Sequence, residues 1–200
     1  MTFRALFFDL GGVIVRTEDK TSRTKLAAEF GMSYEEMDRF VFESPTAVLA
    51  SLGKLSEEEH FLDVTRRLNL PESQMPRIRA EFFGGDLVDG EIIELLRSLR
   101  PTHKTGLISN AWDGLRLWII EKKFDDAFEF MTISAEVGMA KPDERIYRYA
   151  LEKLEVEPGQ AIFVDDVEKN ISASQAVGMR GVLFRNSRQA LAEVKQLLEL

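Results

Sequence analysis

Short apolar runs alternate with longer amphipathic segments along most of the chain. The apolar runs predict strands, and the segments with apolar positions at helical spacing predict helices. The expected strands are residues 3–8, 104–108, 128–133, 161–164 and 181–184. The expected helices are residues 91–99, 115–122, 143–154, 168–177 and 189–198. Because short strands alternate with helices, the pattern predicts an α/β fold with a parallel, doubly wound sheet.

One long stretch interrupts this alternation. From about residue 17 to residue 84 the apolar positions follow helical spacing, without the alternation typical of a strand. Two serines, each followed three positions later by a glutamate, match the capping box that opens a helix: Ser33 with Glu36, and Ser56 with Glu59. We therefore expect an α/β core of residues 1–16 and 85–200, and an inserted α-helical cap of residues 17–84.

Composition narrows the class of protein. With 200 residues, 44% hydrophobic and 30% charged, the chain is typical of a soluble globular protein with one sizeable core. It contains no cysteine, which excludes disulfides and thiolate sites and favours a cytoplasmic location. The net charge of −8 argues against nucleic acid or membrane as partner. No apolar run approaches the roughly 20 residues of a membrane-spanning helix, and we expect a monomer or small homo-oligomer.

Polar side chains directly follow three of the expected strands. They are Asp9 after the first strand, Ser109 and Asn110 after the second, and Asp165 and Asp166 after the fourth. Lys141 lies in the connection that follows the expected strand at residues 128–133. Ligands bind at the carboxyl ends of the strands in open parallel sheets. We therefore expect these side chains to surround one site.

These residue types predict phosphate chemistry. Asp9 and Asp166 would repel each other at close range unless a cation lay between them, and hard oxygen ligands suit Mg²⁺. The cation and the ammonium of Lys141 would hold a phosphate dianion, to which the Ser109 hydroxyl could donate. One oxygen of Asp9 would then be free to attack phosphorus.

The order of these motifs resembles that of the haloacid dehalogenase-like (HAD) hydrolase superfamily over nearly the whole chain. The matching segments are FFDLGGV, LISNAW, AKPDERIY and FVDDVEKN, and the helical stretch is similar to the family's small cap. The resemblance implies a Rossmann-like core and a Mg²⁺-dependent phosphatase that forms an aspartyl-phosphate on a small phosphorylated metabolite. It implies these roles: Asp9 as nucleophile; Ser109, Asn110 and Lys141 binding phosphate; Lys141 steadying the nucleophile; Asp9, Asp166 and the Gly11 carbonyl binding metal; Asp165 and Asn170 supporting them.

The sequence departs from the family pattern at Gly11. Most family phosphatases have a second aspartate there, which protonates the leaving oxygen and then activates water. General acid–base catalysis contributes about 10²–10⁴-fold, so we expect slow turnover, a good leaving group, or a proton from water or from the cap. Subgroups with a DLGN- or DLGG-like first motif are similar, and some are taken to act on sugar phosphates.

Three alternatives remain open from the sequence. A 2-haloacid dehalogenase also lacks the second aspartate, but it has little use for the Asp165–Asp166 pair. A phosphonate hydrolase would need a cap lysine, for which Lys54 is the candidate. A binding or regulatory module with a weakened active site is the third.

A few other side chains are candidates for minor roles. Those that we consider for contact with the organic part of a substrate are Arg16, Phe40, Phe42 and Lys54. Trp112 is expected either in the pocket wall or in the core. His60 and His103 lack ligand-like spacing, so we expect both to be structural or exposed.

Overall fold

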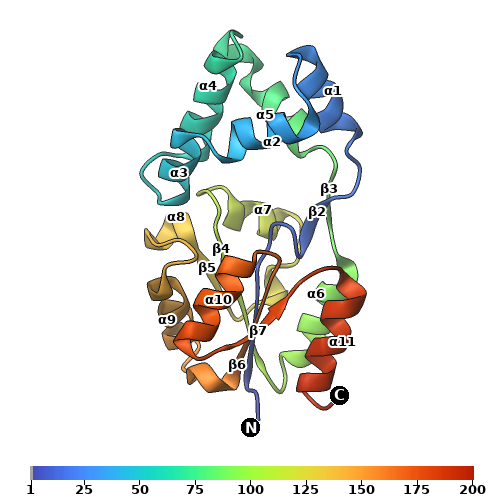
Figure 1. Ribbon diagram of the computed structural model, residues 1–200, viewed down its shortest axis with the longest axis vertical. Helices are drawn as coiled ribbons and strands as arrows, with labels where there is room; N and C mark the ends of the chain where they lie inside the picture. The colour runs from blue at the N-terminus through green and yellow to red at the C-terminus, as the bar shows by residue number, and fades with distance from the viewer. Residues whose placement is uncertain (1) are drawn as a thin grey trace.

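The computed structural model describes residues 2–200 and confirms the predicted α/β sheet (Figure 1). Five parallel strands are arranged in the order β5-β4-β1-β6-β7. Their bounds are β1 Ala5–Phe8, β4 Lys104–Ser109, β5 Phe130–Ile133, β6 Ala161–Asp165 and β7 Arg180–Leu183. Strand β1 is central, with β4 on one side and β6 on the other, so the end of the first apolar run lies between two other strand ends.

Both faces of the sheet are covered by helices. Side chains alternate along a strand, and in β1 Leu6 and Phe8 belong to one hydrophobic cluster while Ala5 and Phe7 belong to the other. The helices that contribute to the first cluster are α6 Gly90–Leu99, α7 Leu115–Glu121 and α11 Ser187–Leu197. Those contributing to the second are α9 Glu144–Lys153 and α10 Glu168–Val177. All four β1 side chains are fully buried, which explains the uninterrupted apolar run.

A separate layer of helices lies above the carboxyl ends of these strands (Figure 1). We call it the helical insert: α1 Thr21–Glu29, α2 Tyr34–Phe42, α3 Pro45–Ser51, α4 Glu57–Arg67, the 3₁₀ turn η1 Glu72–Gln74 and α5 Met75–Phe83. Its own hydrophobic cluster includes Leu26, Val41, Phe61 and Phe82. Both predicted capping boxes are formed, with hydrogen bonds in each direction between serine and glutamate.

A two-stranded antiparallel ribbon joins the insert to the sheet, and the sequence did not predict it. Strand β2 (Val15–Thr17) carries the chain into the insert and β3 (Asp86–Val88) carries it back. Each strand has three residues, which is too short for an alternating pattern to be recognised. The ribbon borders the stretch expected to be helical, residues 17–84, and only Thr17 of its strands lies within that stretch.

The remaining differences from prediction are local. Helix α8 (Ser134–Val137) was not predicted, because it has too few residues for apolar periodicity, whereas α3 lies within the stretch that was expected to be helical. Two further 3₁₀ turns, η2 Asp125–Ala127 and η3 Pro158–Gln160, precede β5 and β6. Every helix within residues 2–200 is too short or too polar to cross a lipid bilayer.

Candidate active site

The register of the sheet places Asp9 beside the ends of its two neighbouring strands. Phe8 pairs with Leu107 of β4 and with Val164 of β6. The Asp9 N–H continues the ladder by donating to the Val164 carbonyl at 2.9 Å. Asp9 therefore stands level with Asp165, and Ser109 ends the strand on its other side.

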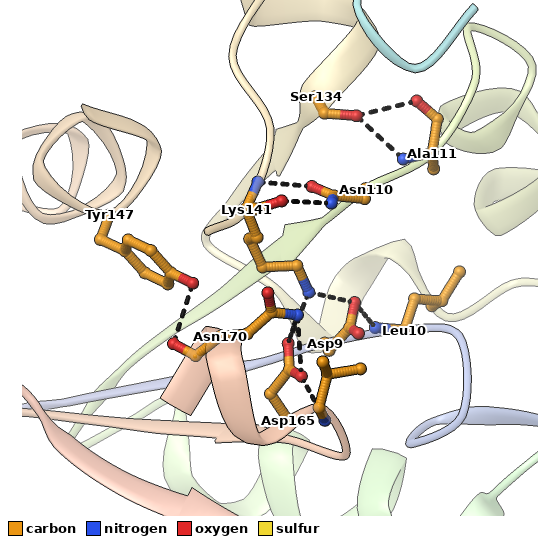
Figure 2. A network of polar contacts seen from close by, with 10 residues as sticks. Asp9, Leu10, Asn110, Ala111, Ser134, Lys141, Tyr147, Asp165 and Asn170 are labelled. Carbon is orange, nitrogen blue, oxygen red and sulfur yellow. Dashed lines mark hydrogen bonds and ion pairs between the residues drawn. The ribbon is translucent and has the colours of Figure 1, made fainter. Parts of the chain in front are cut away.

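Lys141 is buried between two of the predicted carboxylates (Figure 2). Its Nζ lies 2.8 Å from Asp9 Oδ1 and 2.7 Å from Asp165 Oδ2. The side chain of Lys141 is 1% exposed, that of Asp9 is 10% exposed and that of Asp165 is fully enclosed. Such an enclosed cation is stabilised only while its carboxylate partners remain in place.

Asp165 is held from behind. Its Oδ1 accepts hydrogen bonds from the Val167 N–H at 2.8 Å and from Asn170 Nδ2 at 3.0 Å, and its Oδ2 accepts from Asn170 Nδ2 at 3.1 Å in addition to Lys141. Tyr147 Oη donates to the Asn170 carbonyl at 3.0 Å, which secures the start of α10 (Figure 2). Because both oxygens of Asp165 are occupied, this residue positions the Lys141 ammonium.

Asn110 secures the backbone of Lys141 from the other side. Its Nδ2 donates to the Lys141 carbonyl at 2.9 Å, and its Oδ1 accepts from the Lys141 N–H at 2.7 Å. Ser134 adds a second clamp one residue further along, because its Oγ bonds both the N–H and the carbonyl of Ala111 (Figure 2). The direct phosphate contact of Asn110 stays a prediction, and its observed partner is the lysine loop.

The acidic side chains fit a divalent cation. Oxygens of Asp9, Asp165 and Asp166 lie within 4.8 Å of one another. Among residues 2–200, the Asp9 carboxylate accepts one hydrogen bond, from the Leu10 N–H, and forms one ion pair, with Lys141, and both end on Oδ1, which leaves Oδ2 free. Asn170 Oδ1 is buried beside them without a partner in the described chain. Hard, partly unpaired oxygens are the donor set that Mg²⁺ prefers.

The loop after Asp9 is shaped for close approach. The N–H of Gly12 donates to the Val15 carbonyl and the N–H of Val15 donates to the Leu10 carbonyl, so these backbone bonds bypass Gly11 and leave its carbonyl without a backbone donor among residues 2–200. Gly12 has φ +79°, and a Cβ there would lie 2.2 Å from Asp166 Oδ2. Only glycine therefore allows the Asp166 carboxylate to lie against this turn.

Burial sets the electrostatics of the two outer carboxylates. Desolvation raises the pKa of Asp9 to about 6; the Lys141 ammonium opposes this rise and the Asp165 carboxylate adds to it. Partial enclosure at the cavity wall, followed by the charge of Asp165, raises the pKa of Asp166. Both carboxylates are thus in surroundings where added positive charge would be stabilised.

A cavity of about 880 Å³ opens in front of these groups, between the sheet and the helical insert. Its floor includes Asp9, Ser109, Lys141 and Asp166. Ser109 is 2% exposed, and we find no hydrogen bond to its Oγ from the described residues. The volume is within the usual range of roughly 300–1,000 Å³ for small-molecule sites.

Other predicted side chains divide between the cavity and the rest of the molecule. Of the candidates for substrate contact, Arg16 and Phe42 line it, whereas Phe40 and Lys54 are not among the described residues that do so. Trp112 meets both expectations, because it lines the cavity and also packs in the hydrophobic cluster of the insert.

The two histidines lie away from the acidic cluster. His60 is fully buried in α4, with its ring 4.5 Å from the ring of Trp112 and its Nδ1 2.9 Å from Thr46 Oγ1. His103 lies half-buried beside Thr102, whose Oγ1 is 2.9 Å from its Nδ1. Both positions agree with the structural or exposed roles that their isolated spacing predicted.

Sequence reasoning missed Ser134 and Tyr147, which support the site from behind. Ser134 begins the short helix α8 and Tyr147 lies in the middle of α9. The only sequence signal for either is the proximity to Lys141, because hydrogen bonds to backbone groups leave no spacing pattern.

Comparison with known proteins identifies relatives across the whole chain. The family model for haloacid dehalogenase-like hydrolases matches residues 3–178. A sesquiterpene phosphatase of Aspergillus oryzae is 27% identical over 203 residues, which cover 98% of this chain and 97% of the relative. Bifunctional epoxide hydrolase 2 of Rattus norvegicus is 34% identical over 98% of this chain, which spans 39% of that longer protein. A glyceraldehyde 3-phosphate phosphatase of Pyrococcus furiosus is 31% identical over 56% of this chain and 53% of its own.

Solved structures share the fold. A HAD-like family hydrolase from Porphyromonas gingivalis aligns with a TM-score of 0.79 and 21% identity over 100% of both chains. A HAD family enzyme from Bacteroides thetaiotaomicron, solved with magnesium and inorganic phosphate, aligns with a TM-score of 0.76 and 22% identity over 92% of this chain and 96% of that one. The arrangement of sheet and helices is therefore common to these proteins.

Proposed function

Because this chain belongs to the haloacid dehalogenase-like hydrolases, we propose that it is a Mg²⁺-dependent phosphomonoester hydrolase whose nucleophile is Asp9. The observation that carries the proposal is the paired state of Asp9. One oxygen is held 2.8 Å from Lys141 Nζ, and the other is free within a cluster of three carboxylates at the floor of a cavity. Relatives named as phosphatases, one on a sesquiterpene and one on glyceraldehyde 3-phosphate, support the reaction class and differ in the organic group.

The chain's own residues divide the work as follows. Asp9 Oδ2 forms a bond to phosphorus, and the bond from phosphorus to the ester oxygen breaks. Lys141 keeps Asp9 ionised and in place, and Ser109 donates to a phosphoryl oxygen. Water then attacks phosphorus, which restores the Asp9 carboxylate and releases phosphate.

The groups that would bind Mg²⁺ are Asp9, Asp166 and the Gly11 carbonyl, with Asp165 and Asn170 behind them. The ion would supply positive charge beside the phosphoryl oxygens. At Gly11 there is no side chain to protonate the leaving oxygen, so in this proposal a water supplies that proton. We further propose that residues 17–84, which contain the helical insert, act as a cap that shields the reacting groups from bulk solvent.

The setting of the reaction is part of the same proposal. The acidic net charge of −8 suits a small phosphorylated metabolite in the cytoplasm better than nucleic acid. We expect the enzyme to work as a monomer or small homo-oligomer.

The test is phosphate release from an aryl phosphate, measured with Mg²⁺ and with a chelator. We expect Mg²⁺-dependent release that is lost in Asp9→Asn and retained in Asp19→Asn, a matched change at an exposed aspartate. Equal release by Asp9→Asn, or metal-independent halide release from 2-chloropropionate, would overturn the proposal. Absence of both turnover and Mg²⁺ binding would favour a regulatory module.

A further inference from the structure

Three aromatic rings from distant parts of the chain form one surface of the cavity, which we call the aromatic roof. Phe42 is the last residue of α2, Phe83 is the last residue of α5, and Trp112 follows β4. The rings of Phe42 and Trp112 stack with centroids 5.6 Å apart, and Phe83 lies 6.4 Å from Phe42 and 6.3 Å from Trp112. The side chain of Phe42 remains 44% exposed, which is unusual for a ring in such a cluster.

The charged groups that the insert contributes to the cavity are already paired. Arg23 is buried and contacts Asp38 at 2.6 Å and Asp86 of the ribbon at 3.4 Å. Arg79 contacts Glu57 at 2.5 Å. Each of these two cations has an acidic partner, and Arg23 is shared by two carboxylates, so among the described residues this side of the cavity offers no unpaired cation to a ligand.

The neutral polar groups that line this side of the cavity, on the insert and on strand β2, each make a hydrogen bond within the chain. The hydroxyl of Tyr34 accepts from Arg23 at 3.1 Å, and Thr17 donates to Asp86 at 2.5 Å. Ser51 donates to the Ala47 carbonyl at 2.9 Å. The capacity that remains for a ligand on this side is the Tyr34 O–H and the lone pairs of the Thr17 and Ser51 hydroxyls, so a group with many hydroxyls would find few partners here.

From this contrast we propose that the organic part of the substrate is an extended apolar group, alkyl or aryl, that packs against the aromatic roof. This inference rests on the proposed phosphatase function and names the substrate class of the same site. It differs from the sugar phosphate that the sequence resemblance suggested. Covering Phe42 with apolar atoms removes exposed ring surface from water, whereas a sugar would find few free hydrogen-bond partners on the insert.

The test uses alkylphosphonates, which carry the phosphate-like group without a scissile ester. We would measure their dissociation constants by calorimetry with Mg²⁺ for methyl-, butyl- and octylphosphonate. Each methylene that becomes buried is expected to tighten binding by roughly fourfold. Hydrolysis of acetyl phosphate, with and without Asp9→Asn, tests the proposed function separately.

Variants of α2 connect the effect to the roof. Phe42→Ala is expected to weaken octylphosphonate binding about tenfold and to leave methylphosphonate binding unchanged, whereas Phe42→Leu restores most of the loss. Phe40→Ala is the matched control, because Phe40 is on the same helix and outside the cavity lining described above. It should change neither constant.

The outcomes separate the two claims. If acetyl phosphate is hydrolysed in an Asp9-dependent manner but the dissociation constants are flat with chain length or binding is undetectable, the substrate class is wrong and the phosphatase function stands. The same holds if glucose 6-phosphate is bound more tightly than octylphosphonate. If acetyl phosphate is not hydrolysed and no phosphonate binds, both claims fail.

Discussion

Lys141 in the sheet region and Arg23 in the helical insert are both buried, and their surroundings differ. Lys141 lies between Asp9 and Asp165, whose side chains are 10% and 0% exposed. Arg23 is 4% exposed and meets Asp38 and Asp86, whose side chains are 39% and 17% exposed. The first network is nearly dry, and the second opens to solvent at its acidic end.

The use of their hydrogen-bonding groups also differs. Arg23 donates to the Phe82 carbonyl at 2.9 Å and to Tyr34 at 3.1 Å as well as to its acids, so the guanidinium links α1, α2 and α5. Among residues 2–200 the Lys141 ammonium bonds only to carboxylates, and one of them, Asp9, keeps a free oxygen at the cavity floor. A buried charge alone therefore does not mark a reactive site. A buried charge whose partner retains an unused ligand atom is the more specific sign.

Lys141→Met is expected to have the largest effect, because it leaves Asp9 and Asp165 buried without a cation. We expect the free energy of unfolding to fall by about 3–5 kcal/mol and Mg²⁺-dependent turnover to fall about 10³-fold. Urea unfolding and aryl phosphate hydrolysis would measure these changes. Lys153→Met, at an exposed position of α9, is the control. A loss below 1 kcal/mol would mean that Lys141 does not balance the two acids.

Arg23→Met separates structural from catalytic charge. It removes four donor contacts in the insert, so we expect the free energy of unfolding to fall by about 3 kcal/mol. Turnover of acetyl phosphate should change by less than about fivefold, because Arg23 does not contact the proposed reacting groups. A loss of turnover as large as that of Lys141→Met would erase the distinction between the networks.

Gly11→Asp tests whether the missing acid limits the reaction at the site on the sheet. A Cβ at Gly11 has no heavy atom within 4 Å, so the carboxyl group has room. If the missing acid limits departure of the leaving group, hydrolysis of alkyl phosphates should rise about 10-fold to 10²-fold, and that of aryl phosphates less. Gly12→Ala is the contrasting change, since its Cβ would collide with Asp166 and should weaken Mg²⁺ binding. Equal or harmful effects of Gly11→Asp on both substrates would show that the proton is already supplied.

The buried side chain of His60 should make the free energy of unfolding depend on pH. Burial lowers the pKa of His60 to about 4, with Asp63 opposing the shift and Arg67 adding to it. Between pH 6.5 and 4 the unfolded chain therefore binds a proton that the folded chain does not, so stability falls as pH falls. From pH 7 to pH 5 we expect a loss of roughly 2 kcal/mol from this group.

The measurement is urea unfolding at both pH values, with His60→Leu as the variant. His60→Leu should flatten the difference by this amount. An unaltered pH dependence in His60→Leu would assign the acid sensitivity to other groups.

Much of the fold follows from patterns that are local in the sequence. The apolar run at residues 3–8 and the capping boxes at Ser33 and Ser56 specify a strand and two helices, because each satisfies its own backbone groups or buries its own face. The ribbon of β2 and β3 could not be found in this way. Its three-residue strands are stabilised by each other across about 70 residues of chain, and such pairing has no local signature.

The sequence by itself determined that acids, a hydroxyl and a lysine would gather at one edge of a parallel sheet, because strand ends in such a sheet share an edge. Only the tertiary structure decided which partner each one has. Asn110 holds the backbone of Lys141, and both oxygens of Asp165 accept hydrogen bonds while Asp9 keeps one oxygen free. The contact between the rings of Phe42, Phe83 and Trp112 was likewise decided only by the tertiary structure. Contacts of this kind depend on how elements that are distant in the sequence pack against one another. Because protein interiors are close-packed, that packing is determined only in the complete folded chain.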